Sequence, residues 1–246
     1  MRTFVVGLCL ASLAAPAAAL DCAVKSGPGT AALVELYTSE GCSSCPPADR
    51  WMRGLRGAGF GADRVVPLSL HVDYWDYIGW KDPFARPAFT ARQRELAGLQ
   101  GSGLVYTPQV VLAGRDNRGW SSSGRFANDL RAVNDRPARA DIALALKPGT
   151  VTAKAAVTDA KHAADAVLYL AIYENGLSNQ VTAGENRGVT LTHDYVVREW
   201  LGPFALDATA PAEISRPVAV ARPSGVAAFV ENRRTGEVLQ ATMCGE

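Results

Sequence analysis

Apolar and polar positions alternate in blocks between residues 31 and 135, and these blocks predict strands and helices in turn. Short apolar runs that end at polar residues are typical of buried strands. Such runs occupy 31–38, 65–72 and 105–114. A helix is expected after the first of them, because the Pro46-Pro47 pair is tolerated in a first helical turn. Further helices are expected at 89–99 and 124–133.

Beyond residue 136 the pattern changes and strand signals dominate. Turn dipeptides such as Asn175-Gly176 separate the apolar runs. The expected strands are 142–146, 151–157, 166–173, 189–201 and 226–231. We therefore expect an α/β domain over residues 20–136 and an all-β, sandwich-like domain over residues 137–246.

Residues 1–19 have the pattern of a secretory signal peptide. Arg2 precedes an apolar run at 4–13, and small residues follow at Ala17 and Ala19. The run is too short for a stable membrane span, although a retained N-terminal anchor is the alternative. Cys9 lacks a small residue directly before it, which argues against a lipoprotein cut there. The expected location is the periplasm or the secreted fraction, with no membrane span after cleavage.

Composition and charge exclude several classes of protein. The chain has 246 residues, of which 48% are hydrophobic and 20% charged, as in ordinary globular proteins. Lys and Arg number 25 against 24 Asp and Glu, which gives a net charge of +1 without any charged block. No basic surface for nucleic acid is expected from this balance.

Four cysteines remain after the predicted cleavage, and an exported chain meets conditions in which paired cysteines form disulfides. Four cysteines allow three pairings. Cys42 and Cys45 have CxxC spacing, so we expect one bridge there and a second, structural bridge between Cys22 and Cys244.

The CxxC pair carries the clearest chemistry. A thiol reacts as the thiolate, and a helix N-terminus favours that charge through its unpaired N–H groups. Cys42 is expected to be partly exposed and to attack, while the more buried Cys45 resolves the mixed disulfide. Hydroxyls of Ser43 and Ser44 could stabilise the thiolate. A small structural disulfide and a metal site are the alternatives.

A Thr-Pro pair at Thr107-Pro108 opens the third strand. Strand, CxxC helix, strand and Thr-Pro together resemble the thioredoxin fold over roughly residues 31–135. That resemblance implies a cis Pro108 facing the CxxC and binding an extended substrate backbone; a trans proline at a strand start is the alternative. The Ser-Ser dipeptide and the aromatic insertion before Pro108 depart from the usual pattern. The expected fold class is an α/β thioredoxin-like N-terminal domain followed by an all-β sandwich-like C-terminal domain.

The whole mature chain also resembles a secreted bacterial thioredoxin-like family of unknown function. The stretches that carry this resemblance are 35–47, which includes the CxxC, 71–76 and 184–198. The resemblance implies an exported protein with a thioredoxin-like domain and lends no activity.

Other polar and aromatic residues have two interpretations each. His71 is expected to be a buried, hydrogen-bonded histidine, with a copper ligand as the alternative. Glu40 is expected to be a solvated loop carboxylate, with a proton acceptor near the thiols as the alternative. The segment from Asp73 to Trp80, which contains Trp75, forms either a substrate groove or an ordered loop. The polar residues of the later hairpin serve either in turns and cross-strand pairs or at a ligand or domain interface; they are Glu185, Asn186, His193, Asp194 and Arg198.

The sequence thus predicts an exported thiol–disulfide oxidoreductase. Cys42 and Cys45 are its expected catalytic residues, and Trp75, Thr107 and Pro108 its expected substrate-binding residues. Its expected partners are protein or small-molecule thiols and disulfides and a redox partner protein, with no cofactor and no metal. Two alternatives stay open. The first is a copper-binding or copper-delivery protein that uses Cys42, Cys45 and His71; the second is an interaction protein whose CxxC bridge is purely structural.

Overall fold

A computed structural model describes residues 20–207 and 210–245 of the chain. The predicted signal peptide, with Cys9, lies outside the described residues. Within the described ranges, no helix is both long and apolar enough to cross a membrane.

The largest element of the fold is an eight-stranded sheet with the strand order β14-β13-β8-β11-β3-β2-β4-β5. In chain order its strands are β2 (Ala32–Thr38), β3 (Val65–His71), β4 (Gln109–Leu112), β5 (Arg115–Asp116), β8 (Ala166–Glu174), β11 (Val196–Ala205), β13 (Gly225–Asn232) and β14 (Glu237–Gly245). β2 runs parallel to β3 and antiparallel to β4. Every residue of β2 and β3 is buried, as expected for strands covered on both faces, which explains their continuous apolar runs.

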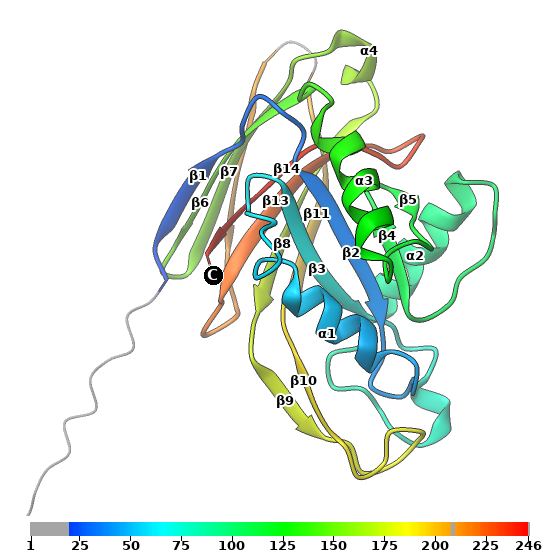
Figure 1. Ribbon diagram of the computed structural model, residues 1–246. Coiled ribbons are helices and arrows are strands. Elements are labelled where there is room, and N and C mark those ends of the chain that lie inside the picture. The colour runs from blue at the N-terminus through cyan, green and yellow to red at the C-terminus, as the bar shows by residue number, and fades with distance from the viewer. Residues whose placement is uncertain (1–19, 208–209, 246) are drawn as a thin grey trace, which may run out of the picture.

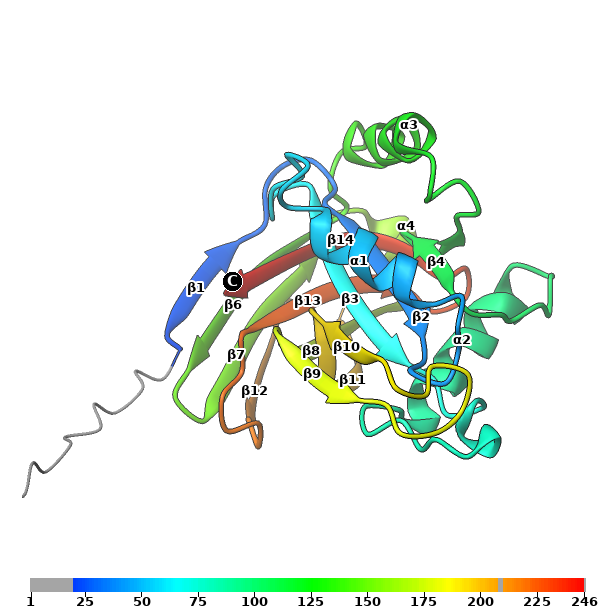
Figure 2. The ribbon, with the colours of Figure 1, turned by 60° about the horizontal axis from the view of Figure 1, so that its bottom comes forward.

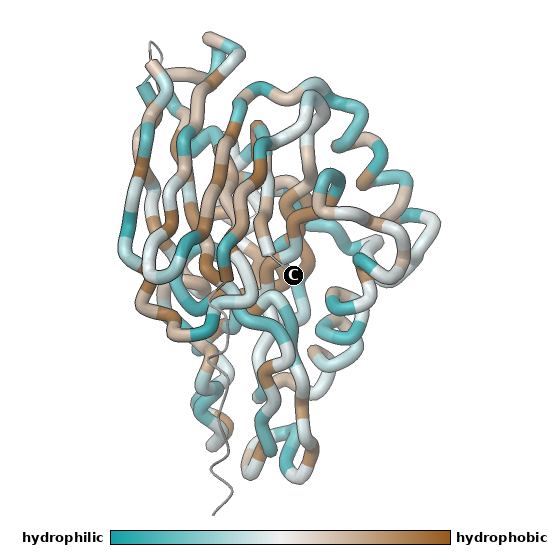
Figure 3. The backbone as a smooth tube through the Cα atoms, turned by 90° about the vertical axis from the view of Figure 1, so that its left-hand side faces the viewer, coloured by the Kyte–Doolittle hydropathy of each residue, from teal (hydrophilic) through white to brown (hydrophobic). Residues whose placement is uncertain are grey.

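A second sheet of four strands, in the order β1-β6-β7-β12, packs against one end of the large sheet. Its strands are β1 (Cys22–Lys25), β6 (Ala140–Lys147), β7 (Thr150–Val157) and β12 (Ala212–Pro217). Alternate residues of β8 divide between two cores: Leu168 and Leu170 face this second sheet, whereas Tyr169 and Tyr173 belong to the other core. In Figure 3 the apolar segments lie mainly along the strands.

Three helices accompany the N-terminal strands: α1 (Pro46–Gly54), α2 (Pro87–Leu99) and α3 (Ser123–Asn134). Figure 1 shows them on the side of the molecule opposite the four-stranded sheet. A short α4 (Ala160–Ala163) precedes β8. The remaining strands, β9 (Leu177–Gln180) and β10 (Thr190–His193), form a two-stranded hairpin. Figure 2 shows this hairpin beside α1.

The expected fold class is wrong. In the described part of the chain the protein is mostly β, with fourteen strands in three sheets, and not an α/β thioredoxin-like domain followed by a sandwich. The reason is the pairing of β11 with β3, where Val196 lies opposite Ser69. This contact joins strands from before and after residue 136 into one sheet.

A buried ionic cluster also connects the two halves of the sequence. Arg92 on α2 lies 2.6 Å from Glu35 on β2 and 2.6 Å from Glu231 on β13. Its guanidinium carbon is 5.2 Å from the ring centroids of Tyr169, Trp200 and Phe229. Burial raises the pKa of Glu35, although the charge of Arg92 opposes this shift. Residues far apart in sequence thus share one buried charge network.

Candidate functional site

The CxxC segment lies in the loop between β2 and α1. Cys42 and Cys45 form a disulfide with a Cα–Cα distance of 5.4 Å, and Cys22 and Cys244 form the second bridge, which confirms the expected pairing. The Cys45 amide donates to the Cys42 carbonyl at 3.2 Å, so the two cysteines close a turn. Cys45 is the residue that precedes the first helical position of α1. The bridge therefore sits where the unpaired N–H groups of the helix concentrate positive partial charge.

Both sulfur-bearing residues are fully buried, with exposed fractions of 0%. The expectation of a partly exposed Cys42 is wrong: the exposed residues of the motif are Ser43 and Ser44. The Ser44 hydroxyl lies 3.3 Å from Cys42 Sγ, so it reaches the sulfur from the solvent side.

The bridge is buried because the loop at 181–189, between β9 and β10, is fastened to it. The Asn186 side-chain amide donates to the carbonyl oxygens of Glu40, at 2.8 Å, and Cys42, at 3.0 Å. The Ser43 amide donates to Glu185 at 2.9 Å, and this hydrogen bond lowers the pKa of the Glu185 carboxyl. Glu185 and Asn186 thus bind the CxxC loop from a distant part of the chain, which is more than turn chemistry.

Glu40 is completely buried, so its interpretation as a solvated loop carboxylate is wrong. Its carboxylate accepts hydrogen bonds from Trp80 at 2.9 Å and from Asn179 at 3.0 Å. His193 Nε2 lies 3.1 Å from the same carboxylate. Three partners from three separate segments therefore hold this charge two residues before Cys42.

The other ring nitrogen of His193 faces α1. His193 Nδ1 lies 3.7 Å from Asp49 Oδ1, and the Asp49 amide donates to the Cys45 carbonyl at 3.2 Å. Burial lowers the pKa of His193, but Asp49 and Glu40 outweigh burial and raise this pKa to about 9. At neutral pH His193 is therefore a buried cation between two carboxylates.

His71 forms a second buried pair beside the first. Its Nδ1 lies 2.7 Å from Asp82 Oδ2, and the Glu40 amide donates to the same oxygen at 2.8 Å. Burial alone would raise the pKa of Asp82, yet His71 and the hydrogen bonds lower it. The expectation of a buried, hydrogen-bonded His71 is confirmed.

Trp75 connects the CxxC loop to the Thr-Pro pair. Its indole N–H donates to the Thr107 hydroxyl at 2.7 Å. On its other side it abuts Gly41, where an added Cβ would stand 3.1 Å from Trp75 Cβ. The Thr107–Pro108 peptide bond is cis, and β4 begins directly after it, with Gln109 opposite Tyr37 of β2. Pro108 thus lies at the end of β2 from which the CxxC loop departs.

The rest of the aromatic segment mostly packs as an ordered loop. Asp73 accepts from the Thr90 hydroxyl at 2.5 Å, and Asp76 accepts from the Asp82 amide at 3.2 Å. Tyr77, by contrast, is 83% exposed. Of the later polar residues, Asp194 pairs with Arg53 on α1 at 2.8 Å, and Arg198 pairs with Glu174.

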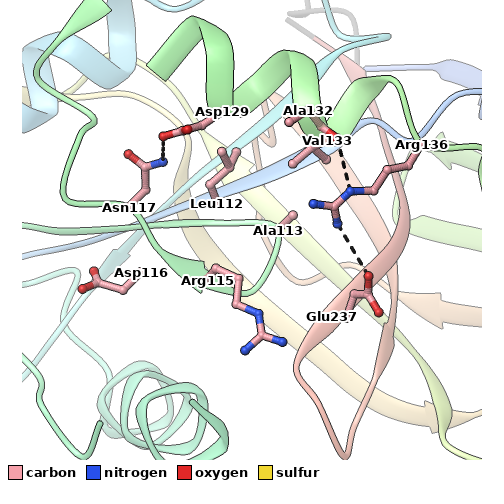
Figure 4. A pocket seen from close by; sticks show the side chains of 10 residues that line it. All are labelled: Leu112, Ala113, Arg115, Asp116, Asn117, Asp129, Ala132, Val133, Arg136 and Glu237. Carbon is pink, nitrogen blue, oxygen red and sulfur yellow. Dashed lines mark hydrogen bonds and ion pairs between the residues drawn. The ribbon is translucent and has the colours of Figure 1, made fainter. Parts of the chain in front are cut away.

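The described residues contain no group of three or more His, Cys, Asp or Glu side chains arranged to hold a metal ion. A cavity of about 610 Å³ opens elsewhere, between the β4–β5 hairpin, α3 and the β13–β14 turn (Figure 4). Its walls include Asn117, which donates to Asp129, and Arg136, which pairs with Glu237. No residue of the CxxC site lines it.

Sequence reasoning named most of the site but missed Asp49, Asp82 and Asn179. Each of the three is a polar residue within or next to an apolar or turn segment. The only hint in the sequence is that a charged or amide side chain stands where burial in the core is expected. Their partners lie on other elements, so local pattern does not single them out.

The fold and the site define a mostly β protein that buries a short-spaced disulfide beneath a loop. The family model described as "Protein of unknown function (DUF1223)" matches residues 33–231, and the chain belongs to this family. A crystal structure of a protein from Agrobacterium tumefaciens is similar, with 25% identity, a TM-score of 0.69 and coverage of 89% of this chain and 95% of that one. HBP35 of Porphyromonas gingivalis is similar in fold, with 18% identity, a TM-score of 0.65 and coverage of 89% and 76%. No curated protein sequence matches this chain.

Proposed function

We propose that this protein is an exported thiol–disulfide oxidoreductase with Cys42 and Cys45 as its redox pair. The observation that carries the proposal is the position of the bridge: it directly precedes α1 and lies next to Trp75, which binds Thr107. A disulfide, a helix N-terminus and a cis-proline thereby occupy one end of the sheet.

The chemistry follows from these positions. A substrate thiolate attacks Cys42 Sγ, the bond between Cys42 and Cys45 breaks, and its electron pair stays on Cys45 Sγ. The first turn of α1 stabilises negative charge at this point, and Ser44 donates to Cys42. The second substrate thiolate then displaces Cys42, so that two electrons pass from the substrate to the bridge. The reverse sequence reduces a substrate disulfide.

The local arrangement supports a relation to the active sites of thioredoxin-like oxidoreductases, although the whole sheet differs. Under this proposal Trp75, Thr107 and Pro108 bind an extended stretch of the substrate next to Cys42. Because both cysteines are buried, the loop at 181–189 has to move before a protein thiol reaches the sulfur. The partners are then protein or small-molecule thiols and disulfides, met in the periplasm or outside the cell.

A copper-handling role for Cys42, Cys45 and His71 has less support. The described side chains form no group of three or more His, Cys, Asp or Glu residues arranged to hold a metal ion, although His71 Nε2 has no hydrogen-bond partner among them. A purely structural bridge is the second alternative, and its reduction potential distinguishes it.

The deciding experiment is the reduction potential of the Cys42–Cys45 bridge, equilibrated with glutathione in the Cys22→Ser/Cys244→Ser variant. We expect a value between roughly −120 and −270 mV, the range of working exchangers. A value below about −300 mV is that of a structural disulfide and would overturn the proposal. Addition of Cu(I) to the reduced protein supplies the test for copper: one-to-one binding that is lost in Cys42→Ser would favour that role instead.

A further inference from the structure

Five ionisable side chains form a buried cluster directly beneath the CxxC loop, and the exchange chemistry above uses none of them. They come from five places in the sequence and are Glu40, Asp49, His71, Asp82 and His193. Each has an exposed fraction of 7% or less. Burying so many charges is unfavourable unless they are paired, and a fully paired structural cluster leaves no polar atom without a partner.

This cluster departs from full pairing at two points. One is His71 Nε2, which is buried without a hydrogen-bond partner among the described residues. The other lies between His193 and Asp49, next to α1. His193 Nδ1 and Asp49 Oδ1 are both buried, and neither has a hydrogen-bond partner within the described part of the chain. They face each other at 3.7 Å, longer than a hydrogen bond but within ion-pair range. The other ring nitrogen, Nε2, is bound by Glu40 at 3.1 Å. The nitrogen without a hydrogen bond is therefore Nδ1, which is directed at α1.

The open position belongs to the turn of α1 that follows Cys45. The Asp49 amide donates to the Cys45 carbonyl, so Asp49 lies one helical turn after the buried cysteine. Asp49 Oδ2 is engaged by the Thr38 hydroxyl at 3.3 Å, so Oδ1 is the oxygen left to carry a proton.

The remaining charges around His193 are already paired with one another. The His71 and His193 rings meet edge to face at a centroid distance of 4.8 Å, but His71 is paired with Asp82. Asp194, the next residue on the chain, is paired with Arg53 of α1 at 2.8 Å. Glu40 and Asp49 are therefore the carboxylates that act directly on His193.

We propose that His193 is the proton-holding residue of the redox site and supplies, through Asp49, the proton that the Cys45 thiolate takes when the bridge opens. This inference rests on the proposed function. A thiolate formed at a fully buried sulfur is unfavourable until it is protonated. His193 holds a proton at neutral pH and faces Asp49 Oδ1 at 3.7 Å. Asp49 follows Cys45 by one helical turn, and side chains four residues apart are neighbours on a helix, so the proton can pass without contact with solvent.

The protons and electrons balance as follows. A dithiol substrate loses two protons to solvent and two electrons to the bridge, and leaves as a disulfide. Cys45 receives its proton from His193 by way of Asp49 Oδ1, and His193 regains a proton from solvent. Cys42 takes its own proton from solvent after the substrate has left. When the bridge re-forms, the Cys45 proton returns along the same path.

The test measures how fast dithiothreitol reduces the Cys42–Cys45 bridge from pH 6 to pH 10. Each rate is divided by the concentration of the dithiothreitol thiolate at that pH, which gives a rate constant for the thiolate. In the otherwise unchanged protein we expect a level rate that falls as the pH passes about 9. His193→Gln keeps a donor for Glu40 but has no acidic proton to release between pH 6 and 10, so its rate at pH 7 should fall about a hundredfold, with no inflection. Asp49→Asn should behave in the same way.

His162→Gln is the matched control, because His162 lies on α4 beside Arg139 and away from the site. A His193→Gln rate and pH profile like those of His162→Gln would overturn the inference while leaving the proposed function standing. If the bridge instead has the low potential of a structural disulfide, the proposed function fails first.

A second measurement needs no substitution. If His193 and the bridge exchange a proton, they are coupled, and the coupling acts in both directions. The NMR titration of the His193 ring should then have different midpoints in the oxidised and reduced protein, while His162 keeps one midpoint. Equal midpoints for His193 in the two states would overturn the inference even if the variants fail to fold.

Discussion

The side-chain amide of Asn186 lies 3.0 Å from the carbonyl oxygen of Cys42, although 144 residues separate them in the chain. The same amide also reaches the Glu40 carbonyl, so one side chain holds the turn on both sides of Gly41. The second half of the sequence thereby helps to determine whether the Cys42–Cys45 bridge of the first half is accessible.

Asn186→Ala should make the bridge easier to reduce. Loss of two hydrogen bonds loosens the loop at 181–189, so the rate of reduction by a small phosphine should rise at least severalfold. The free energy of unfolding should fall by about 1–3 kcal/mol, because the Glu40 carbonyl loses the side-chain amide that binds it and the Cys42 carbonyl keeps only the Cys45 amide. Stopped-flow fluorescence gives the rate. Asn128→Ala, at an exposed position of α3, is the control; equal rates in both variants would contradict the role of Asn186.

The two disulfides should separate cleanly by function. Cys45→Ser should trap a substrate on Cys42 as a mixed disulfide, since the resolving sulfur is gone. Cys22→Ser/Cys244→Ser should keep exchange activity but lose about 2–5 kcal/mol of stability. Mass spectrometry of the trapped adduct and denaturant unfolding give the two readouts. Exchange that persists in Cys42→Ser would show that the chemistry lies elsewhere.

Stability should depend on pH through His193. Its pKa is raised from 6.5 in the unfolded chain to about 9, so the folded state binds the proton more tightly. The resulting stabilisation is fully present below pH 6.5 and is lost as the pH rises through 9, with an upper size of about 3 kcal/mol. Urea unfolding at intervals from pH 6 to 10 measures it. The loss should be absent in His193→Gln and present in His162→Gln.

Arg92→Met should be strongly destabilising. It removes the only side chain that the described contacts place between Glu35 and Glu231, and leaves two buried carboxylates facing each other. A loss of about 3–5 kcal/mol is expected, as for other buried ion pairs deprived of one partner. Chemical denaturation measures it. Arg94→Met, two residues away on the exposed side of α2, should change stability by less than about 0.5 kcal/mol.

Trp75→Phe should impair protein substrates selectively. The substitution keeps an aromatic ring but removes the hydrogen bond to Thr107, which under the proposed function holds the substrate-binding segment in place. KM for a reduced cysteine-containing peptide should rise about fivefold, the equivalent of one hydrogen bond, whereas the rate with dithiothreitol stays the same. An equal loss with both substrates would assign Trp75 to the stability of the loop alone.

Local sequence pattern found most of the individual elements and both disulfides, but not the assembly. The apolar run at 166–173 predicts a buried strand, and β8 is one. The local pattern does not indicate which strands pair with β8. The pairing of β11 with β3 depends on two hydrogen bonds of Ser69 to residues more than a hundred positions away. The Ser69 amide donates to the Tyr195 carbonyl, and the Ser69 hydroxyl donates to the Asp194 carbonyl.

The expected single strand at 189–201 illustrates the same limit. The structure divides it into β10 and β11, which belong to different sheets, and the break falls at Tyr195, whose φ of 57° is in the left-handed region. Neither the apolar pattern nor a turn dipeptide marks this position. The break directs β10, with His193, towards α1 while β11 enters the large sheet.

The Cys22–Cys244 bridge joins strands of two different sheets across a sequence separation of 222, whereas the sequence separation of Cys42 and Cys45 is 3. During synthesis the CxxC pair is therefore complete long before Cys22 can meet Cys244. Under the proposed function, the unpaired Cys22 thiol then shares the nascent chain with an exchange-competent disulfide 20 residues downstream. Correct maturation thus depends on β1 being kept away from the CxxC loop, or on an outside isomerase, until the last strand emerges.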